Sequence, residues 1–184
     1  MDLRPGSLLV ATPALLDPNF ADSVVLVLEH NDEGALGVVL NRPSVVTVGA
    51  VLEVWAGLVG EPDVLFQGGP VGLDGALALA LLADPADEPV GWRRCFGDLG
   101  MVDLDSPVEL VDGGIAALRV YAGYAGWGTG QLEAEIAEGS WYVIDSEPSD
   151  FFRPDVESLR RDVLRRQPGE LAWVSTRPAD PTLN

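Results

Sequence analysis

Two runs of apolar residues, separated by a short polar turn, constrain the fold of this chain more than any other feature. The first run covers residues 23–30 (SVVLVLEH) and the second covers residues 35–40 (ALGVVL). Both are rich in β-branched residues, which favour strands. Residues 31–34 (NDEG) between them have the composition of a hairpin loop. We therefore predict two paired antiparallel strands that are apolar on both faces.

Further strands and three helices are expected around this hairpin. The strands cover residues 8–12, 63–67, 76–82, 117–122 and 141–145. The segment 76–82 alternates Leu with Ala, so both of its faces are apolar and it belongs inside a covered sheet. Apolar residues at helical spacing predict helices over 47–56, behind a Thr47 N-cap, over 131–139 and over 154–166. Strand pairs interrupted by helices predict a mixed α/β (α+β) protein in which helices pack on a mixed sheet.

The charge of the chain excludes several classes of function. It has 29 Asp and Glu against 11 Lys and Arg, a formal net charge of −18, and all of its cations are arginine. Without lysine there is no Walker A phosphate loop, no pyridoxal Schiff base and no kinase lysine. A surface of this charge repels nucleic acid and anionic membranes. We therefore expect no direct contact with DNA and no binding to a membrane.

Catalytic and metal-binding groups are scarce. Cys95 and His30 are the only residues of their types. A zinc site needs several such ligands, and no serine lies in a G-x-S-x-G elbow. The lone cysteine and an N-terminus without signal-peptide character indicate a reducing cytoplasm. We predict no metal, no cofactor and no membrane span, and we favour a protein that is not an enzyme.

The predicted helix over 154–166 carries the one basic cluster in the sequence. It consists of Arg160, Arg161, Arg165 and Arg166. The spacing predicts ion pairs from Glu157 to Arg161 and from Asp162 to Arg166. This surface is either a solvated helix face or a contact surface for an anionic partner. We expect the tail from Arg177 to form a surface strap.

Several polar and glycine positions have both a structural and a functional interpretation. His30 ends its predicted strand, where it either caps a turn by hydrogen bonding or has a functional role as the one side chain that changes protonation near neutral pH. Asn41 and Arg42 either hold a turn or place polar groups at one edge of the sheet. Gly68 and Gly69 either turn the chain or present N–H groups to an anion. The start of the predicted helix at Gln131, near Trp127, could receive an anionic group. Gln131 occupies the position of the third glycine of a dinucleotide-binding turn, so that fingerprint is not met.

Several motifs of the chain together resemble those of the bacterial AlgH/YqgE family. They are residues 6–13 (GSLLVATP), 17–20 (DPNF), 23–31 (SVVLVLEHN), 37–43 (GVVLNRP), 68–71 (GGPV) and 123–136 (GYAGWGTGQLEAEI), followed by Trp141 and Tyr142. The resemblance extends over nearly the whole chain and keeps the order of the family. Residues 91–112 and the arginine-rich helix match least distinctively.

The resemblance implies a compact bacterial cytoplasmic protein with a large bent sheet and a few helices. We expect one AlgH/YqgE-like domain over residues 1–184, because no linker divides the chain, with residues 84–115 as a candidate small lobe. The family carries a transcriptional-regulator label, without an established biochemical activity. The candidate ligand-binding residues that match its motifs are His30, Asn41, Arg42, Gly68, Gly69, Trp127, Gln131 and Glu135.

Three hypotheses for function follow. The first is a regulatory or interaction protein that binds a protein partner or a small anionic ligand without touching DNA. The second is an anion-binding protein or hydrolase-like enzyme with one cleft formed by His30, Asn41, Arg42 and Gln131. In that cleft Arg42 and the helix N-terminus would hold the anion, with His30 or Glu135 as acid or base. In the third hypothesis, all eight candidate residues have only structural roles, in the turns and the core of the sheet.

Overall fold

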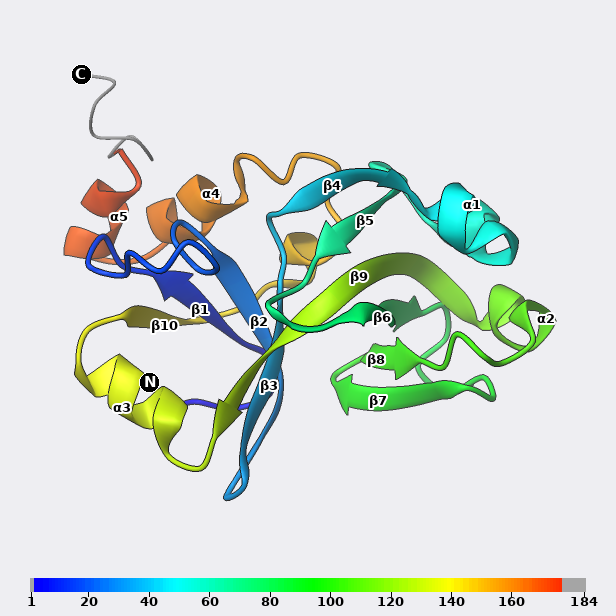
Figure 1. Cartoon of the computed structure of the whole chain (residues 1–184), viewed down its shortest axis with the longest axis horizontal. Helices are drawn as coiled ribbons and strands as arrows, with labels where there is room; N and C mark the ends of the chain where they lie inside the picture. The colour runs from blue at the N-terminus through cyan, green and yellow to red at the C-terminus, as the bar shows by residue number, and fades with distance from the viewer. Residues whose placement is uncertain (1, 177–184) are drawn as a thin grey trace.

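The computed structural model describes residues 2–176, in which ten strands form one strongly bent sheet (Figure 1). The main path through the sheet follows the order β10-β1-β2-β3-β9-β6-β8-β7, while β5 pairs with β9 and β4 pairs with β5. The strands are β1 (Ser7–Ala11), β2 (Val24–Asn31), β3 (Gly34–Val39), β4 (Pro43–Thr47), β5 (Val64–Gln67), β6 (Val71–Leu82), β7 (Trp92–Phe96), β8 (Leu99–Val102), β9 (Ile115–Gly128) and β10 (Trp141–Asp145).

Short helices cover the two faces of this sheet. The α-helices are α1 (Val48–Val51), α2 (Val108–Val111), α3 (Gln131–Ala137), α4 (Leu159–Arg165) and α5 (Glu170–Val174), and the 3-10 helices are η1 (Glu53–Leu58), η2 (Asp112–Gly114) and η3 (Pro148–Asp150). The expected fold class, a mixed α+β protein with a large bent sheet, is confirmed. Only β5 and β9 run parallel among the paired named strands of the described region, so the sheet is mixed.

The predicted hairpin is confirmed as β2 and β3. The two strands pair antiparallel from Val25 opposite Val39 to Asn31 opposite Gly34. Leu28 is an extra residue in β2, where the register shifts, and its side chain is buried. Both faces of this hairpin are buried. One face packs into the core enclosed by the bent sheet, and the other packs against α3 and the segments beside it. Burial on both faces explains why the runs are apolar throughout.

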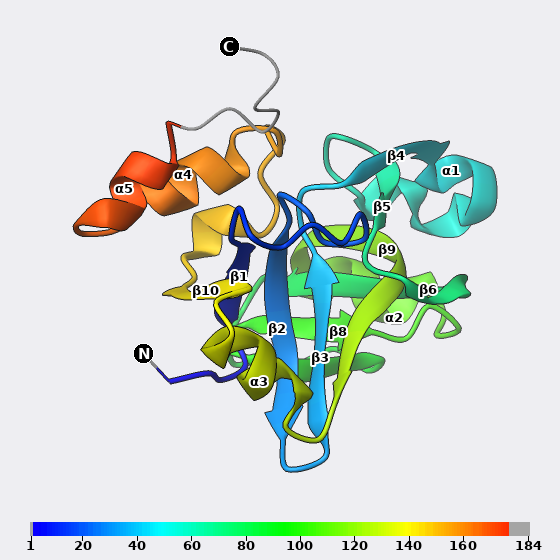
Figure 2. The ribbon, with the colours of Figure 1, turned by 60° about the vertical axis from the view of Figure 1, so that its left-hand side comes forward.

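The long strand β9 connects the two halves of the sheet. Its first part pairs with β6, and its last part, Ala125 to Gly128, pairs with β3. Figure 2 shows β2, β3 and the end of β9 running upright, with β6 and β8 crossing behind them. The prediction that this strand stops at residue 122 is therefore wrong. Its glycines continue the strand because they allow close backbone contacts, as a Cβ at Gly123 would lie 2.5 Å from the Gly69 carbonyl oxygen.

The predicted helices form, but each is shorter than expected. The segment 47–56 divides into α1 and η1, which bury Val48 and Trp55 and leave Val51 exposed. Thr47 occupies the predicted N-cap position, directly before α1, but its side chain makes no capping hydrogen bond. α3 has seven residues, and α4 begins at Leu159, after a turn in which Ser158 donates to Asp155. The apolar residues of α4, Leu159, Val163 and Leu164, are buried, as the helical spacing of the segment predicts.

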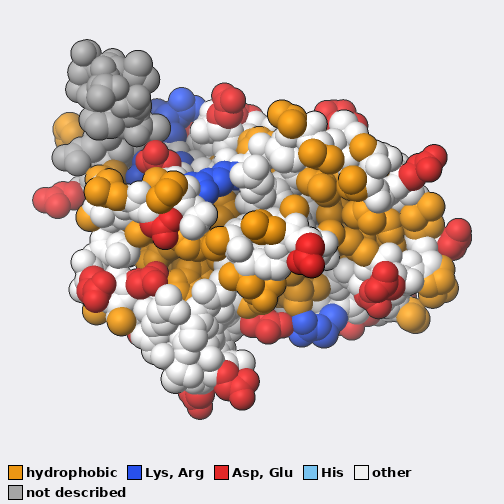
Figure 3. All heavy atoms as spheres, viewed as in Figure 1, with side chains coloured by type: hydrophobic (Ala, Val, Ile, Leu, Met, Phe, Trp, Pro, Cys, Tyr) orange, Lys and Arg blue, Asp and Glu red, His pale blue; other side chains and the backbone are white. Residues whose placement is uncertain are grey.

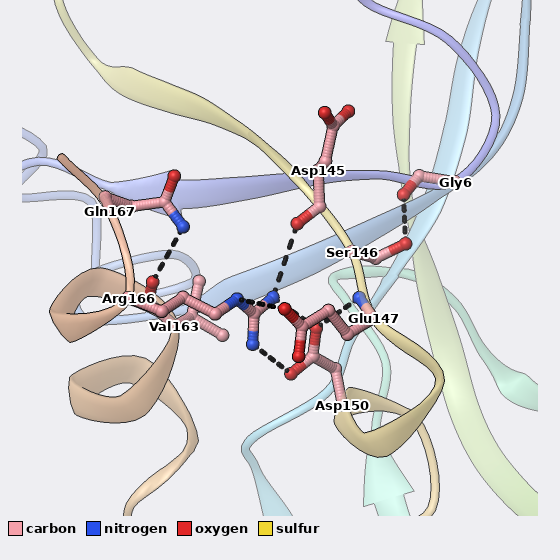
Figure 4. A network of polar contacts seen from close by, with 8 residues as sticks. All are labelled: Gly6, Asp145, Ser146, Glu147, Asp150, Val163, Arg166 and Gln167. Atoms are coloured by element: carbon pink, nitrogen blue, oxygen red, sulfur yellow. Dashed lines mark hydrogen bonds and ion pairs between the residues drawn. The ribbon is translucent and has the colours of Figure 1, made fainter.

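The arginines around α4 bind other segments of the protein and do not form the two predicted helical pairs. Arg166 pairs with Asp150 in η3 (Figure 4). Arg153 pairs with Asp162. Arg160 donates to the carbonyl oxygen of Ala11. These arginines pair with groups that are distant in the sequence or outside the helix, and not with the acids one helical turn away. The surface of α4 is therefore only partly a solvated helix face. The expected strap from Arg177 lies outside the described residues.

The segment proposed as a small lobe contributes β7, β8, α2 and η2. Its two strands extend the sheet beyond β6, and Trp92, Val102 and Val111 join a core with Val48 and Trp55 of the α1–η1 segment. The domain assignment stays a prediction. Within the described region, no helix has both the length and the apolar character needed to cross a membrane.

Candidate functional site

The structure places the eight predicted site residues in two separate groups. The hairpin of β2 and β3 determines this, because His30 lies next to the last residue of β2, near the turn, whereas Asn41 follows β3 at the opposite end. Asn41 accepts a hydrogen bond from the N–H of Val24, the first residue of β2. His30 lies six positions after Val24, which corresponds to roughly 20 Å along a strand. The predicted single cleft of His30, Asn41, Arg42 and Gln131 is therefore wrong.

The first group lies where β9 leads into α3, beside the hairpin turn. His30 Nε2 is 2.6 Å from Glu133 Oε1, and this hydrogen bond lowers the pKa of the Glu133 carboxyl. Gln131 Oε1 accepts from the N–H of Gly128, and its Nε2 donates to Glu135 Oε1 over 3.1 Å. These side chains attach α3 to the sheet and to the link that precedes it.

Glu135 has the most elaborate environment in this group. Its Oε2 atom accepts hydrogen bonds from the indole Nε1 of Trp127, over 3.0 Å, and of Trp141, over 2.9 Å. Both indoles are buried, and both pack against Phe20. The carboxylate thus satisfies two buried donors that would otherwise have no acceptor. Its oxygens are engaged within the chain, which makes Glu135 a poor candidate for a general base.

The second group lies at the base of the hairpin. The Asn41 amide accepts from Val24 and donates to the carbonyl oxygen of Asp22. Arg42 donates to the carbonyl oxygens of Asn19 and Ala21, and burial lowers its pKa. Both side chains therefore hold the loop between β1 and β2.

Gly68 and Gly69 belong to this base group and lie against β9. The Gly68 carbonyl accepts from Val39, and a Cβ on Gly68 would lie 2.3 Å from the Gly123 carbonyl oxygen. Gly69 has a φ of +153°, and a Cβ there would lie 2.2 Å from the carbonyl carbon of Tyr124. These glycines are required for the close approach of two backbones. Ligand binding by any of the eight residues stays a prediction.

A metal centre has no candidate in the described part of the chain. Among residues 2–176, no group of three or more His, Cys, Asp or Glu side chains is arranged to hold a metal ion. By residue type, His30 and Cys95 would be the first candidates for metal ligands. Neither belongs to a group of described residues that could hold a metal ion. His30 contacts Glu133, and burial raises the pKa of the Cys95 thiol, which disfavours the reactive thiolate.

An exposed hydrophobic surface over β4, α1 and η1 is the most distinctive feature that sequence reasoning missed. We name it the β4–α1 face and define it by four exposed side chains, Val45, Val46, Val51 and Val54. Val45 is 97% exposed and Val54 is 68% exposed. In Figure 3 hydrophobic side chains gather over β4, β5, α1 and β9, with carboxylates around their margin. Surface patches of this kind mark interaction sites more often than isolated apolar residues do.

The charge distribution of this face differs from that of the whole chain. Residues 43–60 contain a single charged residue, Glu53, in a chain of net charge −18. Two further exposed carboxylates, Glu61 and Asp63, follow directly in the sequence. None of these three carboxylates forms an ion pair with another of residues 2–176. The low charge of residues 43–60 was the signal in the sequence that could have revealed the face.

Comparison with known proteins identifies the family. A family model described as AlgH-like matches residues 8–172. The chain belongs to the AlgH-like family. Among its AlgH-like relatives, a UPF0301 protein of Streptomyces coelicolor is 59% identical over 182 residues, which covers 97% of this chain and 94% of that protein. A UPF0301 protein of Mycobacterium tuberculosis is 47% identical over 185 residues, with 99% and 91% covered.

Two solved structures share the AlgH-like fold. The crystal structure of a protein from Corynebacterium diphtheriae matches with a TM-score of 0.89 and 34% identity, covering 96% of this chain and 94% of that one. The solution structure of the AlgH protein from Pseudomonas aeruginosa matches with a TM-score of 0.71 and 28% identity, covering 97% and 98%. The resemblance noted in the sequence is thereby confirmed.

Proposed function

We propose that this AlgH-like chain is a regulatory interaction protein that binds another protein through the β4–α1 face. The observation that carries the proposal is the exposure of four valines within ten residues, on a segment with one charge. Burial of apolar surface is the main favourable contribution to most protein association. We also place the protein in the cytoplasm, because its single cysteine fits a reducing compartment.

The partner has a defined chemistry. It presents an apolar segment to the four valines and carries Lys or Arg beside that segment. Glu53, Glu61 and Asp63 are exposed carboxylates without a partner cation in the described residues, so basic residues at the rim of the interface would pair with them. Complementary charges at a rim accelerate association and exclude wrong partners.

Regulation without direct DNA contact is part of the proposal. The net charge of −18 opposes the phosphate contacts that supply most non-specific affinity for DNA. In addition, the arginines in and directly after α4 that could offer a basic surface are partly engaged, since Arg166 binds Asp150 and Arg160 donates to the Ala11 carbonyl oxygen. A mobility-shift titration at low salt tests this part. We expect no retarded band, and tight, sequence-selective retardation would contradict the proposal.

Selection from a displayed peptide library tests the binding face. The bait is the purified chain, and the library is depleted beforehand on Val54→Asp protein. We expect enriched peptides that share an apolar segment with flanking Lys or Arg. Their affinity should fall at least tenfold for Val45→Asp and Val54→Asp, because a carboxylate buried against apolar groups loses its hydration.

The control is Leu16→Asp, which changes another highly exposed apolar side chain outside the face. It should retain the affinity of the unmodified chain. Glu53→Gln should weaken binding by a smaller factor and reduce its salt dependence. Enrichment of peptides without basic residues, or equal binding to the Val54→Asp protein, would contradict the proposal.

A further inference from the structure

A cavity of about 450 Å³ lies between the ends of three strands and the segment that follows β10. One wall comes from the end of β6, at Leu81 and Leu82, and from the β7–β8 turn, at Phe96 and Leu99. Phe151, just after η3, provides the opposite wall. The volume and the mainly apolar lining are typical of small-molecule sites. This cavity contains none of the eight residues predicted from the sequence and none of the β4–α1 face.

The strand wall of the cavity is held by main-chain and aromatic contacts. The N–H of Leu82 donates to the carbonyl oxygen of Asp98 over 3.0 Å, which ties β6 to the β7–β8 turn. The rings of Phe96 and Phe151 meet edge to face, with centroids 5.7 Å apart. Leu99 and Phe151 are buried in the same core, so these apolar walls are already shielded from water on most of their surface.

The opposite wall is held by polar contacts from three directions. Arg166 binds Asp150 through two hydrogen bonds, and Ser146 Oγ donates to the Gly6 carbonyl oxygen over 2.5 Å (Figure 4). Arg119, a buried residue of β9, donates to the carbonyl oxygen of Phe151. A ligand entering the cavity therefore meets two walls that are ordered in advance, which reduces the entropy cost of binding.

The charge at the cavity favours a cation. Asp98 is the single charged residue among the described residues that line it. Arg94 NH1 lies 3.5 Å from the Asp98 carboxylate, but Arg94 also binds Glu88 over 2.6 Å. One guanidinium is thus shared between two carboxylates, which leaves one negative charge in this cluster. An anionic ligand would meet repulsion here, whereas a protonated amine would find a partner.

We propose that this cavity binds a small amine, with an apolar aliphatic or aromatic body between the Leu81 and Phe151 walls and its ammonium group paired with Asp98. The site goes beyond the proposed function, since it uses different elements and a different class of ligand. Because the Asp98 side chain is 44% exposed, an ion pair with it corresponds to a preference of up to about fivefold over a neutral analogue.

Calorimetric titration with three probes of equal length tests the proposal. The probes are octylamine, octanol and octanoate, kept below their aggregation limits. We expect saturable binding of octylamine, binding of octanol that is about threefold to fivefold weaker, and no binding of octanoate. Asp98→Asn should abolish the difference between the amine and the alcohol, because it removes the charge and keeps the shape of the side chain.

Two further variants separate this site from general attraction to an acidic protein. Leu81→Trp fills the cavity and should abolish binding of both octylamine and octanol, while thermal unfolding without probe shows that the variant is folded. If it does not fold, Asp98→Asn carries the test alone. Glu109→Gln, an exposed carboxylate on α2, should leave the affinity for octylamine within twofold. Absence of saturable binding, or an amine affinity that Asp98→Asn leaves unchanged, would overturn the proposal.

Discussion

The guanidinium of Arg166 and the carboxylate of Asp150 form two parallel hydrogen bonds, of 2.8 Å and 2.6 Å, between the end of α4 and η3 (Figure 4). Asp150 is only 2% exposed, and its Oδ2 also accepts from the N–H of Glu147. Arg166 in turn donates to the Asp145 carbonyl at the end of β10. This pair fastens the C-terminal helices to the edge of the sheet.

Removing one member of this pair should be costly. Asp150→Asn leaves the guanidinium without its main counter-charge in a partly buried position, and we expect a loss of about 3 kcal/mol in the free energy of unfolding. Urea unfolding followed by circular dichroism measures it. Arg4→Ala breaks the exposed pair with Asp145 and should cost below about 1 kcal/mol. Equal losses for the two variants would contradict the structural importance of Asp150.

Asn41 should act as a structural clasp at the base of the hairpin. Asn41→Ala leaves the N–H of Val24 without its acceptor and the Asp22 carbonyl without its donor. Since Val24 is buried, we expect a loss of about 1 to 3 kcal/mol in unfolding free energy. Asn19→Ala is the control, because only the backbone atoms of Asn19 make hydrogen bonds in the described region, and it should cost below about 0.5 kcal/mol. A fully stable Asn41→Ala protein would reject the structural interpretation.

The pair of Arg153 and Asp162 predicts a loss of stability in acid. The hydrogen bond from Arg153, 2.7 Å long, lowers the pKa of the Asp162 carboxyl. A carboxyl whose pKa is lower in the folded state stabilises the fold above its unfolded pKa. That contribution disappears as the pH falls through the folded value. Unfolding free energy measured in urea from pH 6 to pH 2 should therefore fall less steeply for Asp162→Asn than for the unmodified chain. Parallel pH profiles would contradict this.

The local elements of the fold could be predicted because their signals lie within short segments. The β2–β3 hairpin follows from two apolar runs and a polar turn, and β10 from the run WYVID. α3 follows from strong helix formers bounded by glycine. In each case the residues that form the element also contain the information, so no distant contact is needed to predict it.

The bend of the sheet and the partners of the polar residues depend on distant contacts. The glycines of β9 indicate a turn when considered alone, yet Gly68 and Gly69 pack against β9 at Gly123, 55 residues after Gly68. The strand continues through Gly123 although its φ is +71°. Arg166 has an acid at helical spacing, Asp162, but Asp150 lies in a better geometry. The predicted cleft was wrong for a similar reason. It required the C-terminal ends of β2 and β3 to lie together, but antiparallel pairing places them at opposite ends of the hairpin.

Glu135 offers a prediction that separates a structural carboxylate from a catalytic one. Glu135→Leu removes the acceptor of both buried indoles, Trp127 and Trp141, and we expect a loss of about 2 to 4 kcal/mol in unfolding free energy. Glu135→Gln retains a carbonyl oxygen that can accept from both indoles, so its loss should be about half as large. Urea unfolding gives the energies, and the two indole N–H resonances in NMR spectra report the hydrogen bonds directly.

The control for this series lies on the same stretch of chain. Glu138→Leu changes an exposed carboxylate at the end of α3 that has no hydrogen-bonded side chain in the described region, and it should leave both the stability and the indole resonances nearly unchanged. If Glu135→Leu is as stable as Glu138→Leu, the indoles find other acceptors. In that case the Glu135 carboxylate is not needed by the indoles, and the hypothesis that it acts as an acid or base is again the favoured one for this residue.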